Sequence, residues 1–124
     1  MRLLLAEDDA STVEAIRICL EVFKPDCSLT VIDDGTGVTG ALKAEAFDGL
    51  ILDLGLPGLD GMIILEELNQ FSRVPVIVVT ARHIEKDRLK AVKLGVKDFI
   101  NKPFDFRDLL KSVSEHFELS GKNP

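Results

Sequence analysis

The sequence predicts a single α/β domain in which a five-stranded parallel sheet is covered by helices on both faces. Its 124 residues, 46% of them hydrophobic, fit one domain whose core needs no crosslinks. Five short apolar segments alternate with five segments whose apolar residues recur at helical spacing. Because neighbouring parallel strands are joined by helical crossovers, this alternation favours a parallel, doubly wound sheet.

The first half of the chain contains two strand-helix units and a third strand. Residues 3–6 form an apolar run that ends in acids, as expected of a strand buried on both faces. Asp9 or Ser11 can cap the helix that follows, and Pro25 breaks its pattern. The remaining elements predicted here are a strand at 29–32, a helix through 38–46 and a strand at 50–52.

The second half begins with a turn rich in glycine and proline at residues 55–61. Asp60 can cap a helix that runs to about residue 71. Residues 76–79 form the strongest strand of the chain, because they are all β-branched, and this strand ends at Thr80. The last elements are a helix from 84 that stops at Gly95, a short strand around 99–100 and a helix from about 106 to 117.

Charge and composition exclude several classes of function. The net charge is -6 and the chain has no tryptophan or tyrosine, so we expect no direct binding of nucleic acid. No apolar run approaches the ~20 residues that cross a bilayer, so we expect no contact with a membrane. Cys19 and Cys27 follow no metal-ligand spacing and are expected to be free thiols. We expect a cytoplasmic domain over residues 1–119, with a flexible tail or the start of a linker at 120–124.

Polar side chains follow four of the five predicted strands. Glu7 and Asp8 end the first strand, Asp53 the third, Thr80 the fourth and Lys102 the fifth. Ligands of an open parallel sheet bind outside the carboxyl ends of the strands, where the strand order reverses. In the flavodoxin-like order 2-1-3-4-5 the first and third strands are neighbours, so the three carboxylates would meet in one crevice.

Three neighbouring carboxylates need a compensating positive charge. Two like charges about 4 Å apart repel by roughly 4 kcal/mol at an effective dielectric constant of ~20. Mg²⁺ prefers carboxylate, carbonyl and water oxygens and often completes its shell with a phosphate. A lysine and a threonine suit phosphoryl oxygens, and a carboxylate in that setting can be the nucleophile. The pattern therefore predicts a Mg²⁺ site at which Asp53 can form an aspartyl phosphate.

A glycine-rich segment offers a competing interpretation. Residues 35–40 match the Gly-x-Gly-x-x-Gly fingerprint of dinucleotide sites, with Asp53 about 20 residues further on. However, Asp33 and Asp34 would then lie beside the pyrophosphate, and the segment follows an edge strand in the order 2-1-3-4-5. We therefore interpret these glycines as a turn and the start of a helix.

Four stretches, taken together, resemble the receiver domain of two-component response regulators. They are residues 4–9, 50–61, 75–81 and 98–104, and their order and spacing extend the resemblance over essentially the whole chain. The resemblance implies a signalling domain rather than an enzyme, although one that takes part in its own phosphotransfer and autodephosphorylation. Asp53 would accept a phosphoryl group from a sensor histidine kinase or a phosphotransfer protein. Glu7, Asp8, Asp53 and the backbone carbonyl of Gly55 would hold Mg²⁺.

The resemblance also implies how such a domain reports its state. Thr80 would move toward the phosphoryl oxygens, Lys102 would pair with them, and Phe99, at the family's aromatic switch position, would turn inward. The readout surface would be the fourth helix, the fifth strand and the fifth helix, about residues 84–117. That surface would bind an output domain, a downstream protein or a second copy of the chain.

The sequence departs from the family pattern at few positions. Phe99 replaces the more frequent tyrosine, and Val96 replaces a small alanine. Gly55 lacks the side chain often found two residues after the acceptor, and both it and Arg82 lie where the family tunes phosphoryl lifetime.

Two alternative functions fit the sequence less well than a receiver domain. A small phosphatase with an aspartyl-phosphate intermediate would carry a second aspartate at position 55, which is glycine here. A phosphorylation-independent interaction domain would usually have lost one of the predicted site residues, and all are present.

Overall fold

The computed structural model describes residues 1–118, in which five strands form one parallel sheet. The strand order is β2-β1-β3-β4-β5, which confirms the predicted fold. The strands are β1 (Arg2–Ala6), β2 (Ser28–Ile32), β3 (Gly49–Leu52), β4 (Val76–Thr80) and β5 (Asp98–Asn101). The α-helices are α1 (Ala10–Phe23), α2 (Val38–Ala44), α3 (Gly61–Phe71), α4 (Glu85–Lys93) and α5 (Phe106–Val113).

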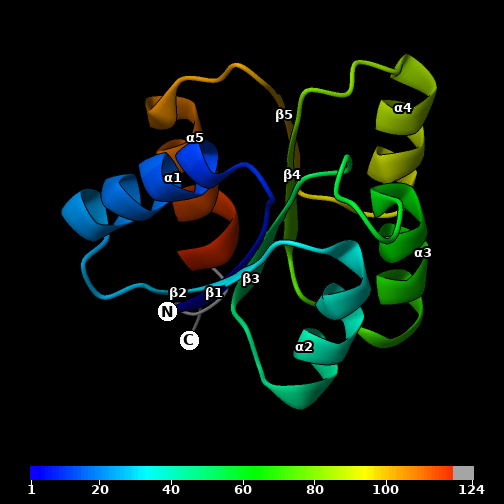
Figure 1. Cartoon of the computed structure of the whole chain (residues 1–124), viewed down its shortest axis with the longest axis horizontal. Coiled ribbons are helices and arrows are strands. Elements are labelled where there is room, and N and C mark those ends of the chain that lie inside the picture. The colour runs from blue at the N-terminus through cyan, green and yellow to red at the C-terminus, as the bar shows by residue number, and fades with distance from the viewer. Residues whose placement is uncertain (119–124) are drawn as a thin grey trace.

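The sheet separates two hydrophobic cores. Helices α1 and α5 cover one face, and α2, α3 and α4 cover the other (Figure 1). Ile16, Leu20 and Leu109 pack on the first face, whereas Val38 and Leu65 pack on the second. Every residue of β3 and β4 is buried. This explains why their sequences are continuous apolar runs rather than alternating apolar and polar residues.

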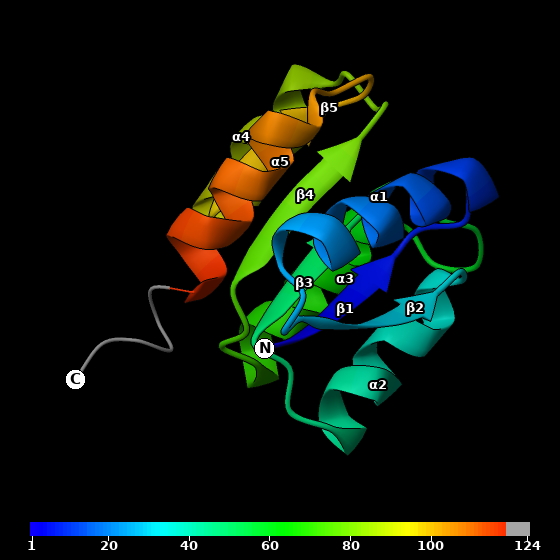
Figure 2. The same cartoon turned by 90° about the vertical axis from the view of Figure 1, so that its left-hand side faces the viewer.

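The register of the two central strands brings their ends together. Leu4 pairs with Leu50, and Ala6 pairs with Leu52. The N–H of Asp53 then donates to the carbonyl of Ala6 at 3.0 Å. The strands all point the same way (Figure 2), so the residues that follow them lie at one edge of the sheet.

Carboxylates cap α1 and α3, two of the helices that begin at this edge. Asp9 caps α1 by accepting from the N–H of Thr12 at 3.0 Å, and Asp60 caps α3 by accepting from the N–H of Met62 at 3.0 Å. Such caps satisfy N–H groups that have no partner within the helix. Of the two caps expected for the first helix, the structure selects Asp9.

The second helix is shorter than the predicted span of 38–46. It ends at Ala44, and Glu45 is already extended. The guanidinium of Arg2 bonds Glu45 at 2.7 Å and the carbonyl of Ala46 at 3.1 Å, while Asp48 accepts from the N–H of Arg2 at 2.7 Å. These contacts hold the segment extended beside β1, so the helix cannot continue.

The last helix also differs from the prediction of one helix through 117. The α-helix ends at Val113 and continues as a π-helical turn, Ser114–Glu118. The ammonium of Lys24 donates to Ser114 Oγ at 2.6 Å and to Glu118 Oε2 at 3.1 Å, and Phe117 is buried in the same turn. The wider turn is held by a partner 90 residues away in sequence, which local spacing does not reveal.

The predicted tail at 120–124 lies outside the described residues, as does residue 119, so the proposed domain boundary stays a prediction. Within residues 1–118, none of the helices has the length and apolar character needed to cross a membrane. Cys19 and Cys27 are free, as expected.

Candidate functional site

Three carboxylates meet at the carboxyl ends of β1 and β3. One oxygen from each of Glu7, Asp8 and Asp53 lies within 4.8 Å of the other two. Glu7 is 2% exposed and Asp53 8% exposed, whereas Asp8 is at the surface. The cluster expected from the strand ends is therefore present, with two of its three members withdrawn from water.

Lys102 compensates the two buried carboxylates. Its ammonium lies 2.6 Å from Glu7 Oε1 and 3.0 Å from Asp53 Oδ2. The N–H of Lys102 donates to the carbonyl of Thr80 at 2.8 Å, which fixes the lysine backbone beside the end of β4. The peptide bond from Lys102 to Pro103 is cis.

The charges of this cluster perturb each other. Burial raises the pKa of Glu7 above its ordinary value, and the charge on Asp53 acts in the same direction, while the hydrogen bond from Lys102 offsets only part of the effect. Burial alone would lower the pKa of Lys102, but its hydrogen bonds to Glu7 and Asp53 raise it. The side chain of Lys102 is therefore a charged ammonium at neutral pH. It does not fully cancel the repulsion between Glu7 and Asp53 in the metal-free cluster.

Gly55 lies directly beside the carboxylate of Asp53. The N–H of Gly55 donates to Asp53 Oδ1 at 2.9 Å and orients the carboxylate. A Cβ at position 55 would lie 3.6 Å from that same oxygen, an ordinary van der Waals contact. A side chain at this position would therefore begin next to the acceptor.

The donor set fits a hard divalent cation. Mg²⁺ binds oxygens at 2.0–2.1 Å, which places opposite ligands about 4.2 Å apart. The carboxylate oxygens of Glu7, Asp8 and Asp53 already lie within 4.8 Å of one another, so small movements bring them to that spacing. Three carboxylate oxygens fill only part of the coordination shell of Mg²⁺. The remaining positions can be taken by water or a phosphate, on the side where Asp8 is exposed.

Thr80 and Phe99 lie beside this cluster rather than in it. Thr80 is buried, and its hydroxyl accepts from the N–H of Arg82 at 3.1 Å. Phe99 is half-buried and lines a cavity of about 120 Å³ with Arg82, Ile84 and Arg88 among others, between β5 and α4. Thr80 therefore lies at the end of the strand next to β3, and Phe99 lies beside the start of α4.

Sequence reasoning missed two features near this edge. Arg82 bridges Asp60 and Asp87, which are too far apart in sequence for any motif to connect them. A mainly apolar cavity of about 460 Å³ also opens beside Lys102. It is lined by Ser11, Thr12, Ala15, Ala81, Lys102, Pro103, Phe104 and Phe106.

The glycine-rich segment is closed by contacts with the protein itself. Residues 35–37 form a short 3₁₀ helix capped by Asp34, which accepts from the N–H of Thr36 at 2.8 Å. The N–H of Gly35 donates to the carbonyl of Pro57 at 2.8 Å, and a Cβ at Gly35 would lie 2.5 Å from the carbonyl oxygen of Leu59. The close approach of this backbone explains the glycine and supports its interpretation as a turn.

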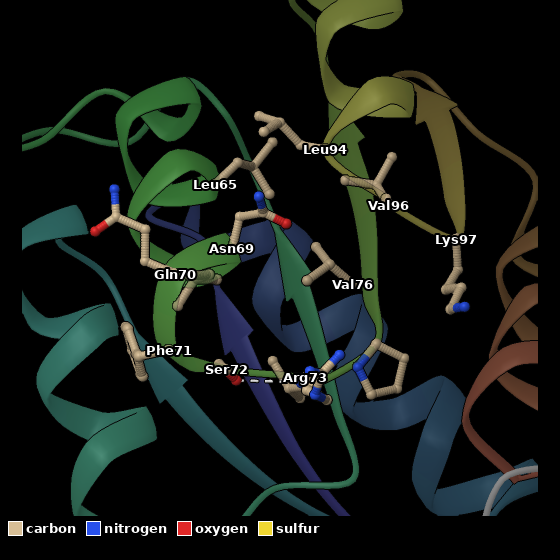
Figure 3. A pocket seen from close by; sticks show the side chains of 14 residues that line it. Leu65, Asn69, Gln70, Phe71, Ser72, Arg73, Val76, Leu94, Val96 and Lys97 are labelled. Carbon is tan, nitrogen blue, oxygen red and sulfur yellow. Dashed lines mark hydrogen bonds between the residues drawn. The ribbon is translucent and has the colours of Figure 1, made fainter.

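A cavity of about 480 Å³ lies at the opposite end of the sheet, between the last turns of α3 and α4 (Figure 3). Leu65, Leu94 and Val96 line it, with Arg73 and Lys97 at its border. It contains none of the predicted site residues, so its size does not make it the candidate site.

Comparisons with known proteins agree with the geometry at the strand ends. The family model described as the response regulator receiver domain matches residues 3–114. The transcriptional activator protein IrlR of Burkholderia pseudomallei is 39% identical over 115 residues, which cover 91% of this chain and 48% of IrlR. The chain spans about half the length of the curated relatives it matches.

Solved structures show the same fold with metals bound. The receiver domain of sensor histidine kinase PA1611 from Pseudomonas aeruginosa PAO1, with a magnesium ion in its active site cleft, is 26% identical, with a TM-score of 0.82 over 94% of this chain and 97% of that one. The Mn²⁺-bound response regulator Rcp1 is 28% identical, with a TM-score of 0.79 over 92% and 89% of the two chains.

Proposed function

This chain belongs to the response regulator receiver domain family of two-component systems, and we propose that it is a Mg²⁺-dependent phosphoacceptor. The observation that carries this proposal is the position of Asp53, whose carboxylate lies beside two further carboxylates and a lysine ammonium. Such a carboxylate has a metal-binding cluster on one side and a fixed cation on the other. Both are required to bring an anionic phosphoryl group to an anionic nucleophile.

Asp53 is the proposed nucleophile. One of its carboxylate oxygens attacks the phosphorus of a phosphohistidine, so that a P–O bond forms and the P–N bond breaks. The electron pair of the broken bond stays on the imidazole nitrogen of the donor. The N–H of Gly55 holds the carboxylate in place, and the ammonium of Lys102 is close enough to pair with the transferred oxygens. Mg²⁺, held by Glu7, Asp8, Asp53 and the carbonyl of Gly55, would supply positive charge against those oxygens.

Thr80 and Phe99 are the proposed switch. The Thr80 hydroxyl lies on the strand next to Asp53 and can donate to a phosphoryl oxygen after a small movement. Phe99 borders a cavity beside α4 into which its ring can turn. We expect the response at α4, β5 and α5, where the apolar side chains of Leu89 and Val92 are exposed on α4. An output domain, a downstream protein or a second copy can bind there.

One face of α1 fits the protein that donates the phosphoryl group. Ser11, Ala15, Ile18 and Val22 recur at helical spacing, so they lie on one stripe. The stripe begins at the apolar cavity beside Lys102 and continues through Ile18 and Val22, which are 51% and 63% exposed. A helix that carries a phosphohistidine could pack its apolar side here and place the donor atom next to the carboxylates.

The cytoplasm is the compartment that suits this chemistry. Cys19 and Cys27 are unpaired, as is usual where thiols are kept reduced. We expect the domain to act by turning itself on and off, through phosphotransfer and autodephosphorylation at Asp53, rather than by converting an external substrate.

Intact mass after incubation with acetyl phosphate tests the acceptor. We expect a phosphoryl-sized gain that requires Mg²⁺ and is lost in Asp53→Asn. Asp33→Asn is the matched control, because Asp33 is an exposed aspartate that follows the edge strand β2. If the native protein gains no mass under any condition, the result favours the alternative hypothesis, a phosphorylation-independent interaction domain.

A protein donor tests the α1 stripe separately. Ile18→Asp should slow phosphotransfer from a phosphorylated histidine kinase by about tenfold or more, as for a central interface residue, and leave the reaction with acetyl phosphate unchanged. Phe71→Asp, at an apolar residue that is 41% exposed and lies at the end of α3, is the control. Equal slowing with both donors would contradict a docking role for the stripe.

A further inference from the structure

Arg82 connects three elements around the carboxylate cluster. Its guanidinium bonds Asp60, the cap of α3, and lies 3.5 Å from the carbonyl of Leu54. Its Nε lies 2.8 Å from Asp87 Oδ2, in the first turn of α4. Its backbone N–H donates to the hydroxyl of Thr80 at 3.1 Å. One residue therefore contacts the end of β4, the start of α3 and the start of α4.

The two carboxylates are held unequally. Although burial alone would raise the pKa of Asp60, the hydrogen bond from Arg82 lowers it below its ordinary value. Asp87 Oδ2 is buried and close to the guanidinium, yet it accepts no well-aligned hydrogen bond within the part of the chain that the structure describes. The tie to α3 is thus a directed hydrogen bond, whereas the tie to α4 is mainly charge attraction.

Few side-chain contacts tie the first turn of α4 to the rest of the described residues. Among its residues only Ala91 is buried, and its cap position, Ile84, makes no side-chain cap hydrogen bond. Leu89 and Val92 are each 53% exposed. A helix with so few buried contacts is expected to open locally more readily than the core, and the Arg82–Asp87 contact is one that ties its start to the carboxyl end of β4.

We propose that Arg82 is a positioning residue that couples the Thr80 hydroxyl to α4. This inference rests on the proposed function, because it concerns how phosphorylation of Asp53 is passed on. While Asp53 is unmodified, Thr80 accepts from Arg82, and the guanidinium holds Asp87 against the capped start of α3. When the Thr80 hydroxyl moves toward a phosphoryl group on Asp53, the N–H of Arg82 loses its acceptor. The segment between β4 and α4 is then released, and the weaker tie to Asp87 opens first.

Hydrogen exchange measured by mass spectrometry tests this coupling. Peptides that cover residues 84–93 are compared with peptides from α5, with Mg²⁺, before and after addition of acetyl phosphate. In the native protein we expect phosphorylation to speed exchange at the start of α4. In Arg82→Met that region should exchange up to about fivefold faster before phosphorylation, the effect of losing a partly exposed ion pair, and should show little further change afterwards.

Matched variants separate coupling from a general loss of stability. Lys93→Met removes an exposed cation of α4 that has no ion pair among residues 1–118, and it should respond to phosphorylation as the native protein does. Asp87→Asn should reproduce the effect of Arg82→Met on α4 and add little to it in the double variant, because both remove one contact. Arg82→Lys should not restore the native response, since one ammonium cannot bond both carboxylates in the fork geometry of a guanidinium.

Intact mass of the same samples separates this inference from the proposed function. If the native protein is phosphorylated but α4 exchange does not change, or if Arg82→Met responds as strongly as the native protein, Arg82 does not couple the two sites. If the native protein gains no phosphoryl group, the proposed function fails. The resting comparison of Arg82→Met with Lys93→Met then decides alone whether Arg82 holds α4, and equal exchange in the two would overturn it.

Discussion

Replacing Lys102 with methionine should destabilise the metal-free protein by about 3 to 5 kcal/mol at pH 7, the usual cost of removing one partner of a buried ion pair. Methionine keeps most of the apolar stem and removes the ammonium that lies 2.6 Å from Glu7 and 3.0 Å from Asp53. The two carboxylates, 2% and 11% exposed at their side chains, would then face each other without a cation.

The distance between the carboxylates gives a second, independent estimate of the destabilisation caused by Lys102→Met. Their ligand oxygens lie no more than 4.8 Å apart, so at an effective dielectric constant of about 20 the repulsion between Glu7 and Asp53 is at least about 3.5 kcal/mol. The variant can escape this cost by binding a proton. For a carboxyl group of ordinary pKa that costs about 3.7 kcal/mol at pH 7 and about 1 kcal/mol at pH 5. The destabilisation should therefore shrink to about 1 kcal/mol at pH 5.

Urea unfolding in the presence of a chelator measures this difference at both pH values, and Lys97→Met is the matched control. Lys97 is exposed and has no ion pair among residues 1–118. Adding Mg²⁺ at pH 7 should restore part of the lost stability, because the cation replaces the missing charge. A deficit of the same size at pH 5 and pH 7 would show that Lys102 contributes packing rather than charge, and a variant as stable as the native protein would refute the electrostatic account.

Two other predictions follow from the same structure. Since the pKa of Glu7 is raised in the folded state, its contribution to stability is full below its unfolded pKa and is lost as pH rises through the folded one. Glu7→Gln should therefore be more stable than the native protein in metal-free urea unfolding at pH 7, and the advantage should disappear near pH 4. Gly49→Ala would place a Cβ 2.5 Å from the ring of Phe117 and should cost about 1 to 3 kcal/mol of unfolding free energy. Gly40→Ala, in a helix with open space around it, should instead stabilise by up to about 1 kcal/mol, and equal effects of the two would contradict this account.

The strand ends were predictable because local pattern and sheet geometry act together there. An apolar run that stops at an acid marks where a buried strand reaches water, and Glu7 and Asp53 both follow such runs. Parallel pairing of Leu4 with Leu50 then puts those acids side by side without any further information. The identity of the carboxylates and of the lysine was therefore predictable from the sequence pattern. Their proximity was predictable from the order of the strands.

Contacts between side chains that are distant in sequence were not predictable in this way. The bond of Lys24 to Ser114 spans 90 residues, and that of Arg82 to Asp60 spans 22. Whether such pairs meet depends on how helices cross the sheet and on how long loops run, which hydrophobic periodicity does not encode. The same limit explains the early end of α2, since nothing near Ala44 in the sequence indicates that Arg2 will hold the next residues extended.

The opposite signs expected for Glu7→Gln and Lys102→Met separate charge from packing at this site. Both residues are largely buried, so a purely structural role would make either substitution destabilising. Repulsion among carboxylates instead makes removal of an acid favourable and removal of the cation unfavourable, and both effects should diminish when Mg²⁺ binds. Repulsion among the carboxylates makes the metal-free protein less stable than its packing alone would make it. A bound cation relieves that repulsion, so the relief adds to the free energy of binding the cation and then the phosphoryl group.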